Sequence, residues 1–181
     1  MIDSMWLRDI LRLKRTPRTG WRLHGVPVVE SVADHTFGAA MLAWRLAREA
    51  DGLDANKVVL MCLFHDFHES RLGDIPTPAK DYLGRERIKE AERDISADQW
   101  QGDEETMAII EEFLEGATPE AQLARAIDHL ELLLQADHHR AAGVSTVQPM
   151  FDRAMSGPAW EHPQTRPHVE QLLARSPHVP D

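Results

Sequence analysis

The chain has 181 residues, of which 43% are hydrophobic and 28% charged, so it is long enough to bury one core and has the composition of a soluble globular domain. Its formal net charge of −10 argues against binding to nucleic acid polymers, whose phosphates repel an acidic surface. Cys62 is the only cysteine, so no disulfide forms within the chain, and we expect a cytoplasmic location. We expect no membrane partner, because no signal-peptide core or bilayer-long apolar run is present.

The spacing of apolar residues and the capping residues predict an all-α fold. Ser31, followed three residues later by Asp34, resembles a capping box with Asp in place of Glu. Thr118 before Pro119 combines an N-cap with a proline at the first helical position, where no amide hydrogen is needed. The expected helices, in chain order, are 4–14, 31–50, 54–67, 85–100, 104–115 and 118–141, followed by two short ones over 149–156 and 165–174.

Two segments interrupt this series of helices. Residues 21–30 read as an extended connection, because a glycine and a proline break any regular helix there. Residues 73–78 cannot be a helix interior, because two prolines restrict the backbone and remove donors. We expect one domain, with residues 1–143 as its core and residues 144–181 as a helical tail that packs on this core or extends it.

The most informative stretch is the place where a buried helix ends in ionisable residues. An apolar run from Val58 to Phe64 leads directly into His65 and Asp66, and Glu69 shares their face if the helix continues. Ionisable groups in such a segment incur a desolvation cost unless they are paired or bind a metal. We therefore interpret this stretch as the centre of a metal-dependent active site.

Two residues elsewhere are candidates for the missing ligands. His35 lies in the first turns of the helix that begins at Ser31, and Asp128 has apolar neighbours on a later helix. Taken alone, each has a plainer interpretation: a core histidine, or a carboxylate that accepts hydrogen bonds from a facing helix. Two imidazoles with two carboxylates suit Mn, Fe, Co, Ni or Zn better than Mg, which prefers an all-oxygen shell.

With these residues in place, the sequence resembles the HD-domain metallophosphohydrolases, over roughly residues 5–140. His35, the His65–Asp66 pair and Asp128 match the H…HD…D signature of that family. Four segments resemble its 5′-deoxynucleotidase branch, namely 18–21, 30–35, 65–69 and 73–80. That branch removes phosphate from deoxyribonucleoside 5′-monophosphates. The resemblance implies an HD-type helical bundle.

The resemblance also implies a role for each matching residue. It implies four metal ligands, namely His35, His65, Asp66 and Asp128. Glu69 would orient or deprotonate the attacking water, and Asp74 would contact the sugar 3′-hydroxyl. Arg18 and Trp21 match a basic–aromatic pair at the substrate pocket, but two residues separate them here. Arg22 therefore competes with Arg18 for the phosphate, and we prefer Arg18.

Several of these residues have other interpretations. Glu69 could be a surface carboxylate paired with Arg71, and Asp74 could be a turn residue before proline. Asp34 is expected to start a helix and not to bind metal. His138–His139 looks like a metal tract but has no partner at helical spacing, so a solvated helix end is the better interpretation.

These observations favour a divalent-metal-dependent 5′-deoxynucleotidase that acts on a small-molecule nucleotide. A second hypothesis keeps the metal site but changes the substrate to a nucleoside triphosphate, a cyclic dinucleotide or a guanosine polyphosphate. A third is a non-catalytic helical module that keeps the metal for folding. Because helical domains of this type often pair and apolar tryptophans permit an interface, we expect a homodimer.

Overall fold

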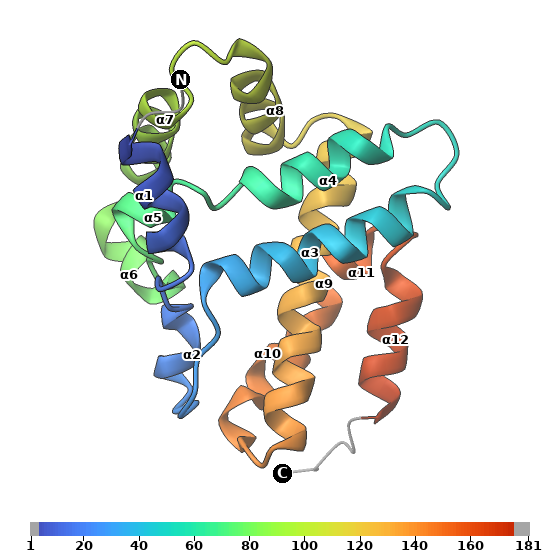
Figure 1. Ribbon diagram of the computed structural model, residues 1–181. Coiled ribbons are helices and arrows are strands. Elements are labelled where there is room, and N and C mark those ends of the chain that lie inside the picture. Colours follow the sequence, from blue (N-terminus) through green and yellow to red (C-terminus); the bar gives the residue numbers. More distant parts are fainter. Residues whose placement is uncertain (1–3, 176–181) are drawn as a thin grey trace.

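The computed structural model describes residues 4–175, and all regular secondary structure among them is helical (Figure 1). The helices are α1 (Ser4–Leu13), α2 (Thr19–Leu23), α3 (Val32–Ala47), α4 (Ala55–Phe64), α5 (Glu69–Leu72), α6 (Thr77–Leu83), α7 (Arg85–Gln99), α8 (Glu104–Glu115), α9 (Pro119–Ala141), α10 (Gln148–Asp152), α11 (Pro158–Glu161) and α12 (Arg166–Arg175), with 3-10 turns at Ser145–Val147 and Ala154–Ser156. The predicted all-α fold class is confirmed. None of these helices is long and apolar enough to cross a bilayer.

Three helices form the centre of the fold. α3 and α4 run antiparallel as a hairpin, and α9 crosses both of them (Figure 1). α3 presents Ala39, Ala43 and Ala47, all buried, to this centre at intervals of one turn. Such small side chains let neighbouring helices approach closely, and larger ones such as Val58 and Ile127 fill the space between them.

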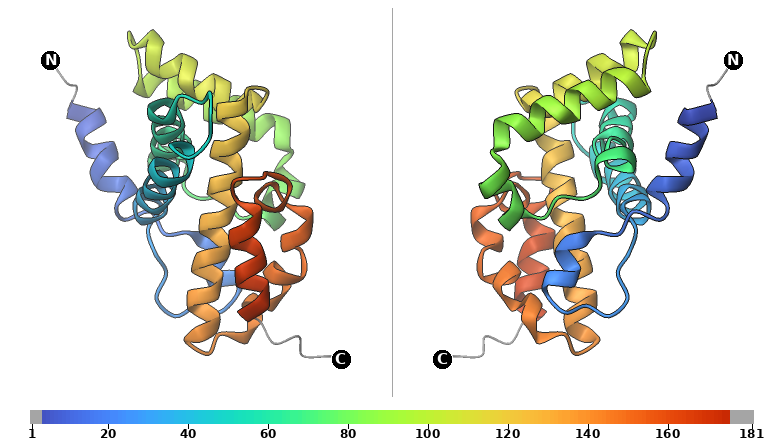
Figure 2. Two further views of the ribbon diagram at one scale, coloured as in Figure 1. Left: turned by 90° about the vertical axis from the view of Figure 1, so that its right-hand side faces the viewer. Right: turned by 90° about the vertical axis from the view of Figure 1, so that its left-hand side faces the viewer.

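The remaining helices cover the two halves of α9. α7 and α8 lie near its N-terminal half, and the helices α10 to α12 flank its C-terminal half (Figure 2). Val169 and Leu172 of α12 belong to the same apolar core as α9. The division of the chain at residue 143 stays a prediction, and residues 176–181 of the predicted tail lie outside the described residues.

The predicted capping residues begin their helices as expected. The Ser31 hydroxyl accepts from the Asp34 amide at 3.2 Å, and the Asp34 carboxylate accepts from the Ser31 amide at 2.9 Å. Asp34 is therefore a helix-start residue. Thr118 accepts from the Ala121 amide at 3.2 Å, with Pro119 at the first position of α9. Each cap satisfies an amide that has no partner within its own helix.

The prediction of an extended connection over residues 21–30 was wrong at its start, because α2 occupies Thr19–Leu23. Trp21 is 1% exposed, and one helical turn after the extended Arg18 directs its indole into the core. Gly25, with φ of +71°, then ends the turn in a conformation that favours glycine. The burial of Trp21 depends on distant parts of the chain, which local pattern does not reveal.

Two other helices end earlier than predicted. α3 stops at Ala47 instead of residue 50, and α4 stops at Phe64 instead of residue 67. After Phe64 the chain forms a tight turn, in which the Glu69 amide donates to the Asp66 carbonyl at 3.0 Å, and α5 follows. The predicted helix over 149–156 is likewise divided, with α10 and a 3-10 turn in its place.

Candidate metal centre and substrate pocket

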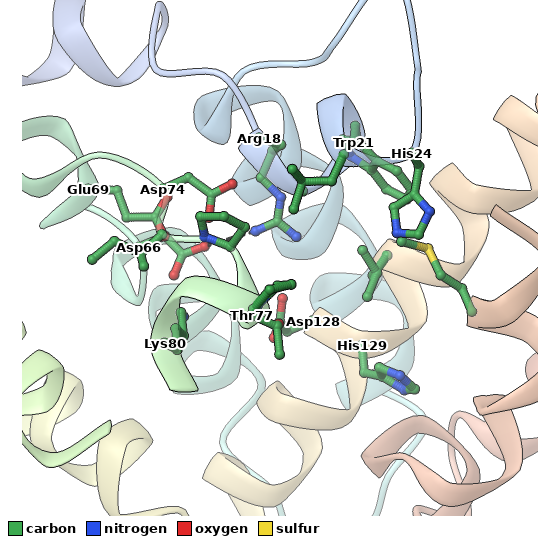
Figure 3. Close-up of a pocket in the computed structure, with 17 residues that line it drawn as sticks. Arg18, Trp21, His24, Asp66, Glu69, Asp74, Thr77, Lys80, Asp128 and His129 are labelled. Atoms are coloured by element: carbon green, nitrogen blue, oxygen red, sulfur yellow. Dashed lines mark hydrogen bonds and ion pairs between the residues drawn. The ribbon is translucent and has the colours of Figure 1, made fainter. Parts of the chain in front are cut away.

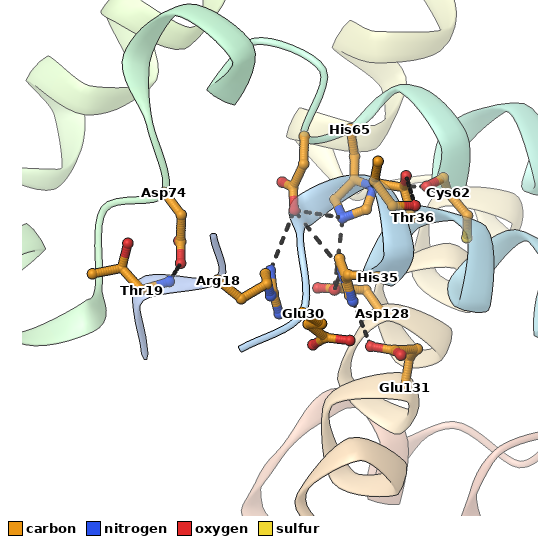
Figure 4. Close-up of polar contacts among 12 residues, drawn as sticks. Arg18, Thr19, Glu30, His35, Thr36, Cys62, His65, Asp74, Asp128 and Glu131 are labelled. Atoms are coloured by element: carbon orange, nitrogen blue, oxygen red, sulfur yellow. Dashed lines mark hydrogen bonds and ion pairs between the residues drawn. The ribbon is translucent and has the colours of Figure 1, made fainter. Parts of the chain in front are cut away.

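His35, His65 and Asp128 come together where α3, α4 and α9 meet (Figure 4), and Asp66 contacts both histidines. His35 comes from the start of α3, His65 and Asp66 from the turn after α4, and Asp128 from the middle of α9. His35 Nε2 lies 3.0 Å from Asp128 Oδ1 and 3.8 Å from Asp66 Oδ2. His65 Nε2 lies 3.2 Å from Asp66 Oδ2 and 3.6 Å from Asp128 Oδ1. Three segments far apart in the sequence thus bring two imidazoles and two carboxylates into contact.

Ligand atoms of His35, His65 and Asp66 lie within 4.8 Å of one another, and Asp128 Oδ1 adjoins both imidazole nitrogens. Neither Nε2 atom makes a well-formed hydrogen bond to any described residue, although both imidazoles are buried. Ligand atoms about 2.1 Å from one ion are about 3.0 Å apart in an octahedral and about 3.4 Å apart in a tetrahedral arrangement. The observed distances of 3.0 to 3.8 Å lie close to these values. The donor set therefore suits a divalent cation.

The other nitrogen of each imidazole is already engaged. His65 Nδ1 donates to the Cys62 carbonyl at 3.0 Å, and His35 Nδ1 contacts the carboxylate of Glu131. Such contacts fix the orientation of a metal-binding imidazole and leave its Nε2 free for the ion. Glu131 was missed from the sequence, although it follows Asp128 by three residues and therefore shares its face of α9.

The charges of the two aspartates and Glu131 favour positive charge at the centre of the cluster. Burial lowers the pKa of His35, but contacts with Asp128 and Glu131 outweigh it and raise this pKa to about 9. Burial also lowers the pKa of His65, which Asp66 and Asp128 nevertheless hold well above its usual value. Although burial opposes it, the histidines hold the pKa of both aspartates well below the usual range. Imidazole protons and a divalent cation therefore compete for this centre.

Glu69 lies beside the cluster, with its carboxylate near Asp66 and the buried His68. It is 6% exposed, and its Oε2 has no hydrogen-bond partner in the described part of the chain. Burial, followed by the charges of Asp66 and Asp74, raises its pKa to about 9. Arg71 instead pairs with Asp9 at 2.6 Å and with Asp98. The interpretation of Glu69 as a surface partner of Arg71 is therefore wrong.

A pocket of about 510 Å³ opens next to these residues (Figure 3). The charged residues that line it are Arg18, Asp66, Glu69, Asp74, Lys80 and Asp128. Trp21 and His24 lie toward the opposite side of the pocket from Glu69 and Asp74 (Figure 3). The pocket is thus charged on one side, next to the candidate ligands, and more apolar on the other.

The structure separates the two candidate arginines. Arg18 lines the pocket, and its Nη1 lies 3.4 Å from Asp66 Oδ2. Burial lowers its pKa, but Asp66, Asp128, Asp74 and Glu69 together raise it above the ordinary value. Arg22 is exposed and is not part of the pocket lining. Of the two arginines, only Arg18 therefore lies in the pocket beside the cluster.

Asp74 and Trp21 both line the pocket, and both also have structural contacts. Asp74 Oδ2 accepts a hydrogen bond from the Thr19 amide at the start of α2. Trp21 Nε1 donates to Glu30 at 2.8 Å, so the polar edge of the indole is engaged away from the pocket. Trp21 thus forms part of the pocket wall. Asp74 joins residues 73–78, which we call the proline loop, to the start of α2.

His139 differs from its prediction as a solvated helix end. It is buried, and its ring meets the Trp21 ring edge-on with centroids 4.8 Å apart. This burial follows from the packing of α2 against the end of α9, which the spacing of His138 and His139 does not reveal. His24 and Met150 also line the pocket, and no local pattern in the sequence identifies them.

Comparison with known proteins agrees with this geometry. The sequence profile of the HD domain matches residues 10–157. The chain belongs to the HD domain family. The family and the His–Asp cluster together indicate a divalent metal ion as the cofactor.

Several relatives of this HD domain protein are known by name or structure. The 5′-deoxynucleotidase HDDC2 of Dictyostelium discoideum is 32% identical over 158 residues, which is 78% of this chain and 82% of the relative. Bovine 5′-deoxynucleotidase HDDC2 is 31% identical over 140 residues, which is 74% of this chain but only 66% of the relative. A conserved hypothetical protein from Pyrococcus furiosus, 28% identical, superposes with a TM-score of 0.77 over 94% of this chain and 98% of that one.

Proposed function

We propose that this HD domain protein is a divalent-metal-dependent 5′-deoxynucleotidase, which hydrolyses deoxyribonucleoside 5′-monophosphates to a deoxynucleoside and phosphate. The observation that carries the proposal is the convergence of His35, His65, Asp66 and Asp128 beside a pocket that also holds Arg18, Glu69 and Asp74. The names of the relatives support this substrate class. The mixed nitrogen and oxygen ligands favour Mn, Co, Fe, Ni or Zn over Mg.

In this proposal the four converging residues hold the metal, and Glu131 keeps His35 in its binding orientation through Nδ1. When bound, the divalent cation supplies positive charge that offsets the charge of the phosphate and acidifies the attacking water. Arg18, which adjoins Asp66 in the pocket, binds the phosphate oxygens. Lys80 is a second cation in the pocket lining and helps to neutralise the phosphate.

Glu69 holds the attacking water and accepts its proton. Its Oε2 has no competing partner among residues 4–175, so a water can occupy that position. Burial and two neighbouring carboxylates raise its pKa to about 9, and positive charge in the centre would lower this pKa and favour the basic form. Proton transfer by a positioned carboxylate contributes about 10²- to 10⁴-fold to the rate of such reactions.

Asp74 binds the sugar of the nucleotide. Its Oδ2 is occupied by the Thr19 amide, which orients the carboxylate and leaves Oδ1 for the 3′-hydroxyl of the sugar. The proline loop holds this residue on the same side of the pocket as Glu69 (Figure 3). The contact would hold the sugar next to the reacting phosphate.

The test is phosphate release from dAMP, dGMP, dCMP, dTMP and dUMP with Mn or Co, measured beside the ribonucleotides. We expect orthophosphate from the deoxyribonucleotides and less from the ribonucleotides. Pyrophosphate or tripolyphosphate from a nucleoside triphosphate would indicate a different phosphohydrolase. The absence of metal-stimulated release from all five deoxynucleotides would end the proposal.

A further inference from the structure

The side of the pocket remote from the metal ligands is completed by the C-terminal part of the chain. Met150, on α10, lines it together with Leu132, which lies one turn beyond Asp128 on α9. Leu23 and His24, at the end of α2, also belong to this lining. Three apolar side chains from three separate elements thus line the pocket together with the imidazole of His24.

His24 is fixed by the same C-terminal part of the chain. Its Nδ1 donates to the Thr146 carbonyl at 2.8 Å, and the Thr146 hydroxyl donates to the His24 carbonyl. A carbonyl oxygen can only accept, so Nδ1 carries the hydrogen, and Nε2 of the neutral ring has a free lone pair. The two residues are 122 positions apart, and their contact holds α2 against the C-terminal segment.

The pocket therefore suits a ligand with two different ends. Glu69, Asp74 and Lys80 lie on one side, Trp21 and His24 lie on the other, and Arg18 lies between them (Figure 3). The volume of about 510 Å³ falls within the range of about 300–1,000 Å³ that is typical of small-molecule sites. A compact anion alone would leave the apolar side unused.

We propose that Leu23, His24, Leu132 and Met150 form a nucleobase subsite, in which the C-terminal segment takes part in substrate recognition. The apolar side chains contact the faces of a flat heteroaromatic ring. His24 Nε2 accepts a hydrogen bond from a ring N–H or an exocyclic amino group, and Thr146 keeps the imidazole in the tautomer that permits this. The inference rests on the proposed function, which places the phosphate at Arg18.

The test compares substrates with and without a base. Met150→Ala and His24→Asn are each assayed with dAMP, dCMP and 2-deoxyribose 5-phosphate, which keeps the sugar and phosphate but has no base. We expect Met150→Ala to raise the KM for dAMP and dCMP by about tenfold, since one apolar contact in a pocket contributes about 10- to 200-fold to discrimination. Both variants should leave kcat/KM for 2-deoxyribose 5-phosphate within about twofold of the wild type. Met155→Ala is the matched control, because Met155 is exposed and does not line the pocket.

Binding gives a readout that does not depend on turnover. In Glu69→Gln protein loaded with Mn, calorimetry should show that Met150→Ala and His24→Asn weaken dAMP binding but not 2-deoxyribose 5-phosphate binding. Equal effects on both ligands, or none on either, would overturn the subsite even if the enzyme is a deoxynucleotidase. If Met150→Ala does not fold, the comparison of His24→Asn with the wild type decides whether the subsite exists. A wild-type protein that binds dAMP through these residues but releases no phosphate would refute the proposed reaction and not the subsite.

Discussion

Glu131 offers the sharpest test of how the metal site is built. It is 8% exposed, and its carboxylate contacts His35 Nδ1 on the side of the ring away from the cluster. Gly38 makes room for it, since a Cβ at that position would lie 3.0 Å from Glu131 Oε1. Replacement of Glu131 by Gln keeps the shape of the side chain and removes its charge, so it isolates the electrostatic part of the contact.

The structure sets the size of the expected effect. Loss of a group that orients a metal-binding histidine costs about 10- to 100-fold in metal affinity, or about 1.4–2.7 kcal/mol. Glu131→Gln still offers an oxygen to His35 Nδ1, so we expect a loss of about tenfold, at the lower end of this range. Glu131→Ala leaves a buried N–H without a partner, which costs a further 1–3 kcal/mol or so in stability, and its metal affinity should fall by about 100-fold.

The assay is the Kd for Mn, measured by competition with a chromophoric chelator, together with thermal unfolding of the chelated protein. Glu115→Gln, on the exposed end of α8, provides a control for the loss of one negative charge. We expect kcat at saturating Mn to change less than the Kd, because Glu131 does not face the pocket. A Glu131→Gln protein that binds Mn within about twofold of the wild type would refute the argument that this carboxylate supports His35.

Four further predictions follow from the same site. Glu69→Ala should lower kcat by about 10²-fold or more while the Mn Kd stays unchanged, and a parallel loss of metal would make Glu69 a ligand instead. Asp66→Ala should abolish the rise in Tm that Mn produces in the wild type; a preserved rise would contradict its place among the ligands. The pKa of His35 is raised from 6.5 to about 9 in the folded protein, so its contribution to the stability of the metal-free protein is complete below pH 6.5 and is lost as the pH rises to about 9. Mn affinity should rise over the same pH range, because protons then compete less for the imidazole. Unfolding of the chelated protein and calorimetry with Mn across this range would test these two opposite trends. Burial raises the pKa of the Cys62 thiol, so it should react with a disulfide reagent only after unfolding, and rapid labelling of native protein would disagree.

The features predictable from sequence are those that neighbouring residues determine. Ser31 and Asp34 form a cap within one turn, so the local sequence alone predicts the start of α3. The ligands could also be predicted, because ionisable residues in an apolar segment are costly unless they are paired or bind a metal, and His65 and Asp66 stand together at the end of such a segment. Their convergence with Asp128 depended on the resemblance to a family, since no local pattern gives the distance between α4 and α9.

The features that were missed all depend on contacts between distant residues. Trp21 points into the core, where its ring packs against His139 near the end of α9. The chain therefore forms the helix α2 where a glycine and a proline had predicted an extended connection. The break after Phe64 likewise reflects the cluster, which lies beside a turn and not on a continuous helix. The hydrogen bonds between His24 and Thr146 join two segments whose local sequences carry no sign of each other.

α9 relates these observations to one another. It carries Asp128 at the metal cluster, Glu131 behind His35, and Leu132 in the apolar part of the pocket. Four residues, or about 6 Å of rise, therefore separate the proposed metal ligand Asp128 from Leu132 of the proposed nucleobase subsite. In the proposed complex the nucleotide lies along this helix, with its phosphate held by Arg18 and Lys80 beside the metal centre and its base held by α2 and α10. A change in the packing of the C-terminal segment would then alter substrate choice and leave the metal centre intact.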